Sequence, residues 1–324
     1  MSAPKRARAP RGRRGSAVHQ GLVGARKLVG TPYLADAELR GEYAREIAPR
    51  TEAALARVLD EVWGAPGALP PRRAIDLGAG TGAVGRTLRR RFGEGLEVVE
   101  VDRTAAPGVV RANLAAELPA VDGTFDLLVA AHLLNELFLD RAPAERVALR
   151  AQRAVTWAER FLAPNGRLIL IEPALRETSR DLLAVRDRLL AGGLHVVAPC
   201  FWTGPGPALA RERDWCHDAA PVPSRPRVDF SYLVLRREPV APRPLHRIVS
   251  DPMPEKGRLR LFICGPDGRH PLMRLSRHRS PNNEPLDHAA RGDAVSIQDA
   301  TIGDDGLRVS ADTIVTLPTS PERA

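Results

Sequence analysis

The residues of this chain best suited to hold a ligand form one short stretch with closely spaced glycines. In residues 73–86, RAIDLGAGTGAVGR, an apolar run contains Asp76, and Gly78, Gly80 and Gly82 follow it at alternate positions. Glycines let the backbone turn sharply and let a ligand press against bare main chain. The unpaired N–H groups at the start of the next helix face the same ligand. The stretch therefore predicts a ligand-binding turn between a first strand and a helix.

Two kinds of ligand match this turn. Gly80, Gly82 and Gly85 fit the G-x-G-x-x-G pattern of a nicotinamide dinucleotide loop. The acidic residue before the first glycine favours another ligand, because D-x-G-x-G-x-G at the end of a first strand resembles the S-adenosylmethionine (SAM) loop of Rossmann-like methyltransferases. A glycine-rich turn without a ligand is the alternative to both.

Two polar residues extend the predicted SAM site along the sheet edge. Asp102 ends the second strand, 20 residues after Gly82, where folds of this type place an acid on the ribose hydroxyls. Asn113, in a short third strand with Leu114, stands where the resemblance puts adenine recognition. The predicted cofactor-binding residues are Asp76, Gly78, Gly80, Gly82, Asp102 and Asn113.

A second polar group follows the fourth strand and predicts the methyl-acceptor side. The apolar run 125–131 reads as a buried parallel strand, and His132, Asn135 and Glu136 come directly after it. An Asn-Pro-Pro-Tyr signature for amine methylation is missing here. His132 is either a base, a substrate contact or a histidine satisfied at a strand end. The three residues are the catalytic candidates, with no essential base assigned.

Alternating strand and helix patterns must position these groups. We expect strands at 73–77, 96–101, 125–131, 167–171, 195–198 and 229–235, and helices at 83–92, at 143–162 and around 182–190. Two helices between 33 and 63, broken at Pro49 with Thr51 as a cap, precede them. The expected fold is α/β: a Rossmann-like SAM-dependent methyltransferase fold with a mostly parallel seven-stranded sheet, N-terminal helices, a cysteine-containing insert and a small C-terminal β-module.

The same patterns divide the chain into four parts. We expect a disordered basic arm over 1–32, a helical segment over 33–70, a SAM-binding domain over 71–239 and a β-module over 240–324. The SAM-binding domain includes a Pro-rich insert over 199–228, a length that is usually functional in a compact domain. A tight turn is expected at residues 164–166, Pro-Asn-Gly.

Composition narrows the compartment and the partners. No apolar run of the 324 residues approaches the ~18 needed to cross a membrane, so we expect no membrane contact. Three cysteines build no disulfide framework, and no secretory signal is present, which predicts a reducing, cytoplasmic setting. Residues 1–30 also resemble an Arg-rich, acid-free organelle transit peptide, so a mitochondrial location is the alternative. The oligomeric state is not predicted.

Positive charge is concentrated in two regions. Residues 1–35 contain eight lysines and arginines and no acid, and residues 236–279 contain eleven against four acids. Such patches suit a polyanion, first of all nucleic acid, although a merely solvated surface is the alternative. Arginine pairs with phosphate through two parallel hydrogen bonds, so the RNA-binding candidates are arginines of the β-module. They are Arg258, Arg260, Arg274, Arg277 and Arg279.

Several unusual sequence segments in the second half of the chain resemble one protein family. IEPALRETSRDLLAVRDRLL, VVAPCFWTGPGPAL, RDWCH and RLRLFICGPDGR resemble, in this order, the methyltransferase-like proteins of small ribosomal subunit assembly, which include mitochondrial members and bacterial homologues. The resemblance covers about residues 33–280. It implies a SAM-binding domain that docks on small-subunit rRNA, and a four-iron four-sulfur cluster on four cysteines. Cys200, Cys216 and Cys264 match three of them, and Gly206 stands where the second of the four is expected, about six residues after Cys200.

The departure at Gly206 leaves three readings of the cysteines. Three thiolates and His217 could hold a cluster with one foreign ligand, or a Cys₃His zinc ion. The third reading is a set of ordinary buried thiols.

For the whole chain, the leading hypothesis is a SAM-binding rRNA methyltransferase-like factor of small-subunit biogenesis that acts as a SAM-dependent methyltransferase. A non-catalytic RNA-binding assembly protein that keeps SAM or metal as a structural ligand is the first alternative. A small-molecule methyltransferase is the second.

Overall fold

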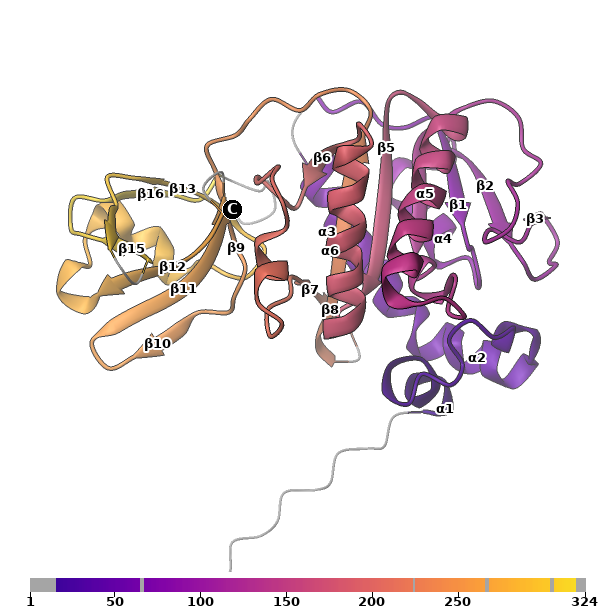
Figure 1. The fold of residues 1–324 in the computed structure, drawn as a ribbon, viewed down its shortest axis with the longest axis horizontal. Coiled ribbons are helices and arrows are strands. Elements are labelled where there is room, and N and C mark those ends of the chain that lie inside the picture. Colours follow the sequence, from indigo (N-terminus) through magenta and orange to yellow (C-terminus); the bar gives the residue numbers. More distant parts are fainter. Residues whose placement is uncertain (1–15, 65–66, 224, 266–267, 304–305, 319–324) are drawn as a thin grey trace, which may run out of the picture.

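A sheet covered by helices on both faces adjoins a smaller β-module (Figure 1). The computed structural model describes residues 16–64, 67–223, 225–265, 268–303 and 306–318. The α-helices of these ranges are α1 (Ala17–His19), α2 (Ala37–Glu46), α3 (Ala48–Trp63), α4 (Ala83–Phe92), α5 (Pro143–Phe161) and α6 (Arg176–Ala191). Shorter helical turns lie at Gln20–Gly24, Tyr33–Ala35, Leu134–Glu136, Pro207–Ala210, Ser276–His278 and Pro281–Asp287. None of the helices in the described ranges is long and apolar enough to cross a membrane.

The first sheet has the predicted Rossmann-like organisation. Its strands are β1 (Arg73–Leu77), β2 (Glu97–Asp102), β3 (Val109–Arg111), β4 (Phe125–Ala131), β5 (Leu162–Pro173), β6 (His195–Ala198), β7 (Asp218–Val222) and β8 (Arg225–Arg236). The order is β3-β2-β1-β4-β5-β8-β6, with β7 paired to β8. Strand β8 runs antiparallel to its neighbours, and the pairs from β3 to β5 are parallel. The sheet has the expected mostly parallel, Rossmann-like organisation, with eight strands in place of seven because β7 of the insert pairs with β8.

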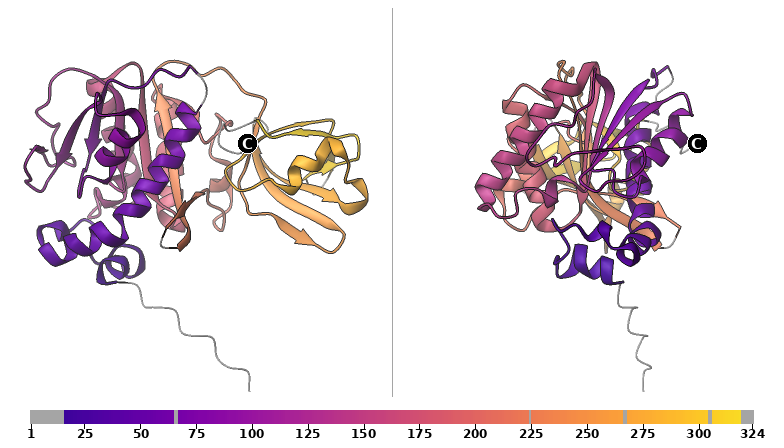
Figure 2. Two further views of the ribbon diagram at one scale, coloured as in Figure 1. Left: turned by 180° about the vertical axis from the view of Figure 1, so that it is seen from behind. Right: turned by 90° about the vertical axis from the view of Figure 1, so that its right-hand side faces the viewer.

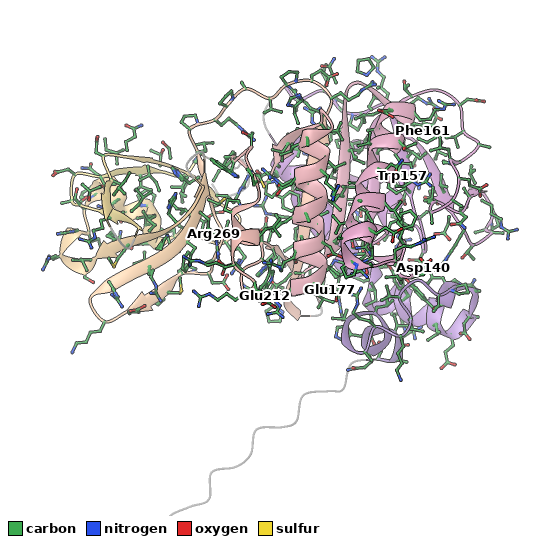
Figure 3. The ribbon with its side chains drawn as sticks, viewed as in Figure 1. Asp140, Trp157, Phe161, Glu177, Glu212 and Arg269 are labelled. Carbon is green, nitrogen blue, oxygen red and sulfur yellow. The ribbon has the colours of Figure 1, made fainter. Side chains whose placement is uncertain are left out.

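Two hydrophobic layers sandwich the sheet because successive strand residues point to opposite faces. Ala74 of β1 packs in the layer of α3 and α4, whereas Ile75 packs in the layer of α5 and α6. Figure 1 shows α5 and α6 in front of the sheet, and Figure 2 shows α3 on the opposite side. Trp157 and Phe161 of α5, labelled in Figure 3, are fully buried in the α5 and α6 layer.

The C-terminal module has its own sheet and core. Its strands are β9 (His246–Ile248), β10 (Met253–Glu255), β11 (Arg258–Gly265), β12 (Gly268–Leu275), β13 (Ala294–Gln298), β14 (Thr301–Gly303), β15 (Gly306–Val309) and β16 (Ile314–Thr316). They pair in the order β14-β15-β12-β11-β9-β13-β16, with β10 on β11. Leu261, Leu272 and Val295 are buried in the module's separate hydrophobic cluster.

Several local predictions differ from the structure. Helix α3 begins at Ala48 with Pro49 in its first turn, and Ile47 stands at the cap position. Thr51 is therefore a buried helix residue and not the cap, because proline is well suited to the first helical turn. The sequence at 164–166 lies inside β5, which follows α5 directly, with Asn165 in a left-handed conformation at φ 62°.

Two longer segments are more structured than we expect from composition. Residues 16–32, placed in a disordered arm, form α1 and a π-helical turn (Gln20–Gly24), and Val18 is fully buried; residues 1–15 lie outside the described residues. The insert 199–228, read as a loop, contains a 3₁₀ turn (Pro207–Ala210), β7 and the start of β8. Tertiary packing orders both segments.

Candidate functional site

The glycine turn after β1 has the geometry that the sequence predicts. Gly78, Gly80 and Gly82 have φ of 86°, 54° and 76°, values that L side chains rarely adopt. The amides of Gly78 and Ala79 donate to Val101 O at 2.8 and 2.9 Å, which ties the turn to the end of β2. A Cβ on Gly78 would lie 3.1 Å from Leu133 Cδ1. The turn is therefore both strained for other residues and closely packed.

Four predicted cofactor residues meet in one pocket. Gly78, Gly80, Asp102 and Asn113 line a cavity of about 230 Å³ at the carboxyl ends of β1, β2 and β4. Asp102 accepts hydrogen bonds from the amides of Gly80 (2.9 Å) and Thr104 (2.7 Å), so its carboxylate is held at the pocket edge. Asn113 follows β3 by two residues and is not part of that strand.

Two predicted cofactor residues do not line this pocket. Asp76 is completely buried beneath the turn, and burial raises its pKa well above the usual value, with Glu100 and Asp102 adding to the effect. Gly82 is the left-handed cap residue of α4. Neither residue is part of the pocket lining, so their contact with the ligand stays a prediction.

His132 stands on the acceptor side of the pocket. It has a left-handed backbone at φ 58°, an uncommon conformation for a residue other than glycine, and its amide donates to Ile171 O at 2.7 Å. Burial lowers the pKa of its imidazole to about 4. Nδ1 is buried and has no hydrogen-bond partner among the described residues. A neutral imidazole with a free ring nitrogen can accept a hydrogen bond from a ligand.

Asn135 does not line the pocket, and its side chain is hydrogen-bonded to other parts of the protein. Its amide nitrogen Nδ2 donates to His132 O at 2.9 Å, and its Oδ1 accepts from Arg26 Nη2 at 3.3 Å. Arg150, itself buried, donates to Asn135 O at 3.0 Å and to Leu137 O at 3.2 Å. The turn after β4 is held in place by these contacts.

Glu136 lines the pocket but is already engaged by protein groups. Its Oε1 accepts from Tyr33 Oη at 3.2 Å and its Oε2 from the Gly30 amide at 3.4 Å. Arg103 Nη2 lies 3.7 Å from Oε2. Burial raises the pKa of Glu136 to about 7, and the Arg103 charge opposes that rise.

The N-terminal wall of the pocket is not predicted from the sequence. Gly30, Pro32, Tyr33, Leu34 and Tyr43 line it together with the glycine turn. The readable signal is Asp36, whose side chain accepts from the amides of Glu38 and Leu39 as a helix cap and so places Tyr33 just ahead of α2. Tyr33 donates to Glu136, which lies more than 100 residues later in the chain, so local sequence patterns do not predict this contact.

The three cysteines and His217 converge on a second pocket, between the first sheet and the β-module. Cys200, Cys216, Cys264 and His217 line a cavity of about 60 Å³. Burial raises the pKa of Cys216 to about 11 and lowers that of His217 to about 4, with the neighbouring Cys200 adding to the rise at Cys216. Burial therefore favours the neutral forms of Cys216 and His217.

The donor set matches a thiolate-binding ion in kind but not a four-cysteine cluster. Gly206 is absent from the pocket lining, and its amide donates to Asp187 Oδ2 at 2.9 Å. The His, Cys, Asp and Glu side chains of the described residues form no group arranged to hold a metal ion. His217 Nδ1 is buried and has no hydrogen-bond partner among the residues that the structure describes.

The RNA-binding candidates do not share one exposed face. Arg274 is buried, donates to Asn283 O at 2.9 Å and pairs with Asp287, so it supports the module from inside. Arg258 and Arg260 both pair with Glu255. Arg277 and Arg279 are exposed, and Arg279 pairs with Asp287.

Solved structures with similar folds are methyltransferases of low sequence identity. The mitomycin 7-O-methyltransferase MmcR is 17% identical with a TM-score of 0.38, over 65% of this chain and 60% of that protein, so the chain spans less than two thirds of its length. The plantazolicin methyltransferase BpumL with SAH is 10% identical (TM-score 0.42, 68% and 98% covered). The ribosomal protein L11 methylase from Lactobacillus delbrueckii subsp. bulgaricus is 14% identical (TM-score 0.34, 58% and 79% covered). Similarity at these scores says nothing about substrate or activity.

Most of the chain matches the model of one protein family. No curated protein sequence matches the chain. The family model described as mitochondrial small ribosomal subunit Rsm22 matches residues 40–278, well over half of the 324 residues. This match agrees with the resemblance carried by the words around Cys200, Cys216 and Cys264. The chain belongs to the Rsm22 family of the mitochondrial small ribosomal subunit.

Proposed function

We propose that this protein binds SAM in the pocket at the glycine turn and methylates small-subunit rRNA during ribosome biogenesis. The observation that carries the proposal is the single cavity shared by Gly78, Gly80, Asp102 and His132. Bare main chain and a carboxylate on one side suit an adenosyl ligand, and a neutral imidazole on the other suits a methyl acceptor.

The residues divide the work between binding and positioning. SAM supplies an electrophilic methyl group when bound. Asp102, which is fixed by two backbone amides, would accept hydrogen bonds from the ribose hydroxyls of SAM. Asn113 would face the adenine. Neutral His132, which lines the pocket, would accept a hydrogen bond from the N–H or O–H of the acceptor. Leu133 and Leu137 would keep water away from that contact.

The first test separates binding from catalysis. Calorimetry with SAM and S-adenosylhomocysteine should show binding to the wild type and to the exposed-loop control Asp122→Ala, and weak or no binding to Asp102→Ala. Transfer of labelled methyl from SAM to small-subunit rRNA, naked or in assembly intermediates, should follow the same ranking. Absence of binding heat in the wild type contradicts the proposal.

A non-catalytic assembly role is the competing function in the same place. The family description names the small ribosomal subunit, which applies equally to an enzyme and to a binding protein. If the wild type binds SAM but transfers no methyl group to any of these RNAs, SAM is a structural ligand. If methyl is transferred to a small molecule and the RNAs stay unlabelled, the chain is a small-molecule methyltransferase.

For the RNA contact, we propose the exposed Arg277 and Arg279 rather than the buried Arg274. Each phosphate contact that is lost should reduce the slope of log K against log salt by about one. The double variant Arg277→Gln/Arg279→Gln should bind rRNA more weakly with an unchanged melting temperature. Arg274→Gln is the contrasting variant: it should lower the melting temperature. An RNA affinity and salt slope equal to wild type in the double variant would move the RNA surface elsewhere.

We also propose that the cysteine pocket receives a metal, because three thiols and an imidazole from distant parts of the chain line it. Iron–sulfur ligation would make anaerobically purified protein brown, with absorbance near roughly 400 nm. A Cys₃His zinc ion would leave it colourless with about one zinc per chain. Cys216→Ser should lose either metal. Wild-type protein without iron or zinc means that the thiols are ordinary.

The cellular compartment of this protein should be that of the ribosome on which it acts. We propose the cytoplasm of a bacterial-type cell, or mitochondria if residues 1–30 act as a transit peptide. Sequencing the N-terminus of the mature protein distinguishes the two, because a transit peptide is removed.

A further inference from the structure

The segment before α2 crosses the mouth of the SAM pocket. Residues 26–33 contact the residues that follow β2 and β4, at the sheet edge where the pocket opens. Gly30, Pro32 and Tyr33 line the same cavity as the glycine turn. Just beyond them, Leu34 Cδ1 lies 3.3 Å from where a Cβ on Gly80 would stand. The segment therefore forms one wall of the pocket, although it precedes the family-matched region.

A small set of polar contacts holds this segment down. Arg103, directly after β2, donates to Gly30 O at 2.9 Å and to Thr31 O. Glu136, after β4, accepts from Tyr33 Oη at 3.2 Å and from the Gly30 amide at 3.4 Å. The ends of β2 and β4 thus hold the same few residues, each through one polar side chain, Arg103 or Glu136.

These contacts stand beside the cofactor position and not in a distant core. Arg103, Glu136 and Tyr33 all line the cavity that also contains Asp102. Both carboxyl oxygens of Glu136 accept hydrogen bonds from the segment, so they are not free to act on an acceptor. The sequence-based reading of Glu136 as catalytic is better replaced by a role in holding the wall.

We propose that residues 26–33 are a strap that closes over bound SAM, and that Glu136 and Tyr33 are the positioning residues that latch it. The inference rests on the proposed function for the identity of the ligand. A ligand in the pocket touches the strap and the strand ends together, so binding and closure stabilise each other. Release of the ligand requires the latch to open.

Hydrogen–deuterium exchange of the peptide over residues 28–34 tests the latch directly. Without ligand, Tyr33→Phe and Glu136→Gln should exchange faster there than wild type, and the exposed-turn control Glu94→Gln should not. Saturating S-adenosylhomocysteine should slow exchange in the wild type. A latch of one neutral hydrogen bond corresponds to a change of about 2- to 13-fold.

The dissociation rate of S-adenosylhomocysteine distinguishes a latch from a merely structural contact. Tyr33→Phe keeps the ring that lines the pocket and loses only the hydroxyl, so it should raise that rate by the same 2- to 13-fold factor with the association rate nearly unchanged. Wild-type exchange and dissociation rates in both latch variants would overturn the strap. If no SAM or SAH binds at all, the proposed function fails, and the latch is then judged by the ligand-free exchange alone, where equal rates refute it.

Discussion

His132 shows how one residue combines strain, burial and a free polar atom at a sheet edge. Its left-handed backbone costs about 1–2 kcal/mol relative to an ordinary conformation. Its buried Nδ1 lacks a hydrogen-bond partner among the described residues. Both costs are tolerated at one position on the pocket wall. Strain of this kind concentrates at functional sites, which supports the proposed acceptor contact.

The lowered pKa of His132 predicts an acid-sensitive contribution to stability. The folded-state pKa of about 4 lies below the unfolded value of 6.5, so the unfolded chain binds the proton more readily. The free energy of unfolding should therefore be highest above about pH 6.5 and fall as the pH drops towards 4, by roughly 3 kcal/mol for this residue.

Urea unfolding at several pH values measures this contribution. His132→Gln removes the titrating group, so its free energy of unfolding should depend less on pH between 7 and 4 than that of the wild type. His217, which is buried with a similarly lowered pKa, is present in both proteins and cancels in the comparison. Parallel pH profiles would contradict the assignment.

Among the elements, the turn between β1 and α4 has a backbone conformation that requires glycine and also lines the pocket. Gly80 has φ 54° and faces the pocket, whereas Gly93, at the end of α4, has φ 89° and open space around it. Both positions disfavour a side chain through the backbone, but only Gly80 adjoins the cavity. The two glycines therefore form a matched pair.

Substituting each glycine by alanine separates folding from binding. Gly80→Ala and Gly93→Ala should each lose about 1–3 kcal/mol of stability, because alanine is strained at the positive φ of both positions. Only Gly80→Ala should also lose SAM affinity, by tenfold or more, as its Cβ enters the space against Leu34. Thermal unfolding and calorimetry give the two quantities. Equal affinity in both variants would show that the turn does not contact the ligand.

At the scale of the whole molecule, a buried ion pair joins the β-module to the first domain. Arg247 of β9 is buried and pairs with Glu61 of α3, at 2.5 Å between Nη2 and Oε1. Arg247 also donates to Gly292 O at 2.6 Å, and Arg57 lies beside Asp218 at 3.6 Å. A second pair, Arg269 with Asp214 at 2.5 Å, ties β12 to the insert, and Arg269 lies at that junction in Figure 3.

Breaking the Arg247–Glu61 pair should be costly because it leaves a buried charge without its partner. Glu61→Leu should lower the free energy of unfolding by about 3–5 kcal/mol. The matched control is Glu97, which pairs with Arg73 at the surface with 53% of its side chain exposed, and Glu97→Leu should cost less than about 1 kcal/mol. Urea denaturation measures both. Similar losses of unfolding free energy in the two variants would mean that the buried Arg247–Glu61 pair contributes no more stability than a surface ion pair.

How far the sequence predicts this molecule depends on the range of the interactions. The bounds of β1, α4, β4 and β6 agree with the predictions, because each has a local apolar pattern and ends before a glycine, a proline or a polar residue. The bounds around Asn113 and residues 164–166 were wrong, because pairing with neighbouring strands decides where a short strand ends.

By itself, the sequence determined the strand–turn–helix of the glycine loop, the alternation that makes a Rossmann-like sheet, and membership of a family through its linked words. Periodicity and turn chemistry are local properties, so they are readable along the chain. Only the tertiary structure decided that Asp76 and Arg274 are buried, that Asn135 does not line the pocket, and that residues before α2 form its wall. Those outcomes depend on which side chains from distant segments fill the same space, and close packing settles that after the chain has folded.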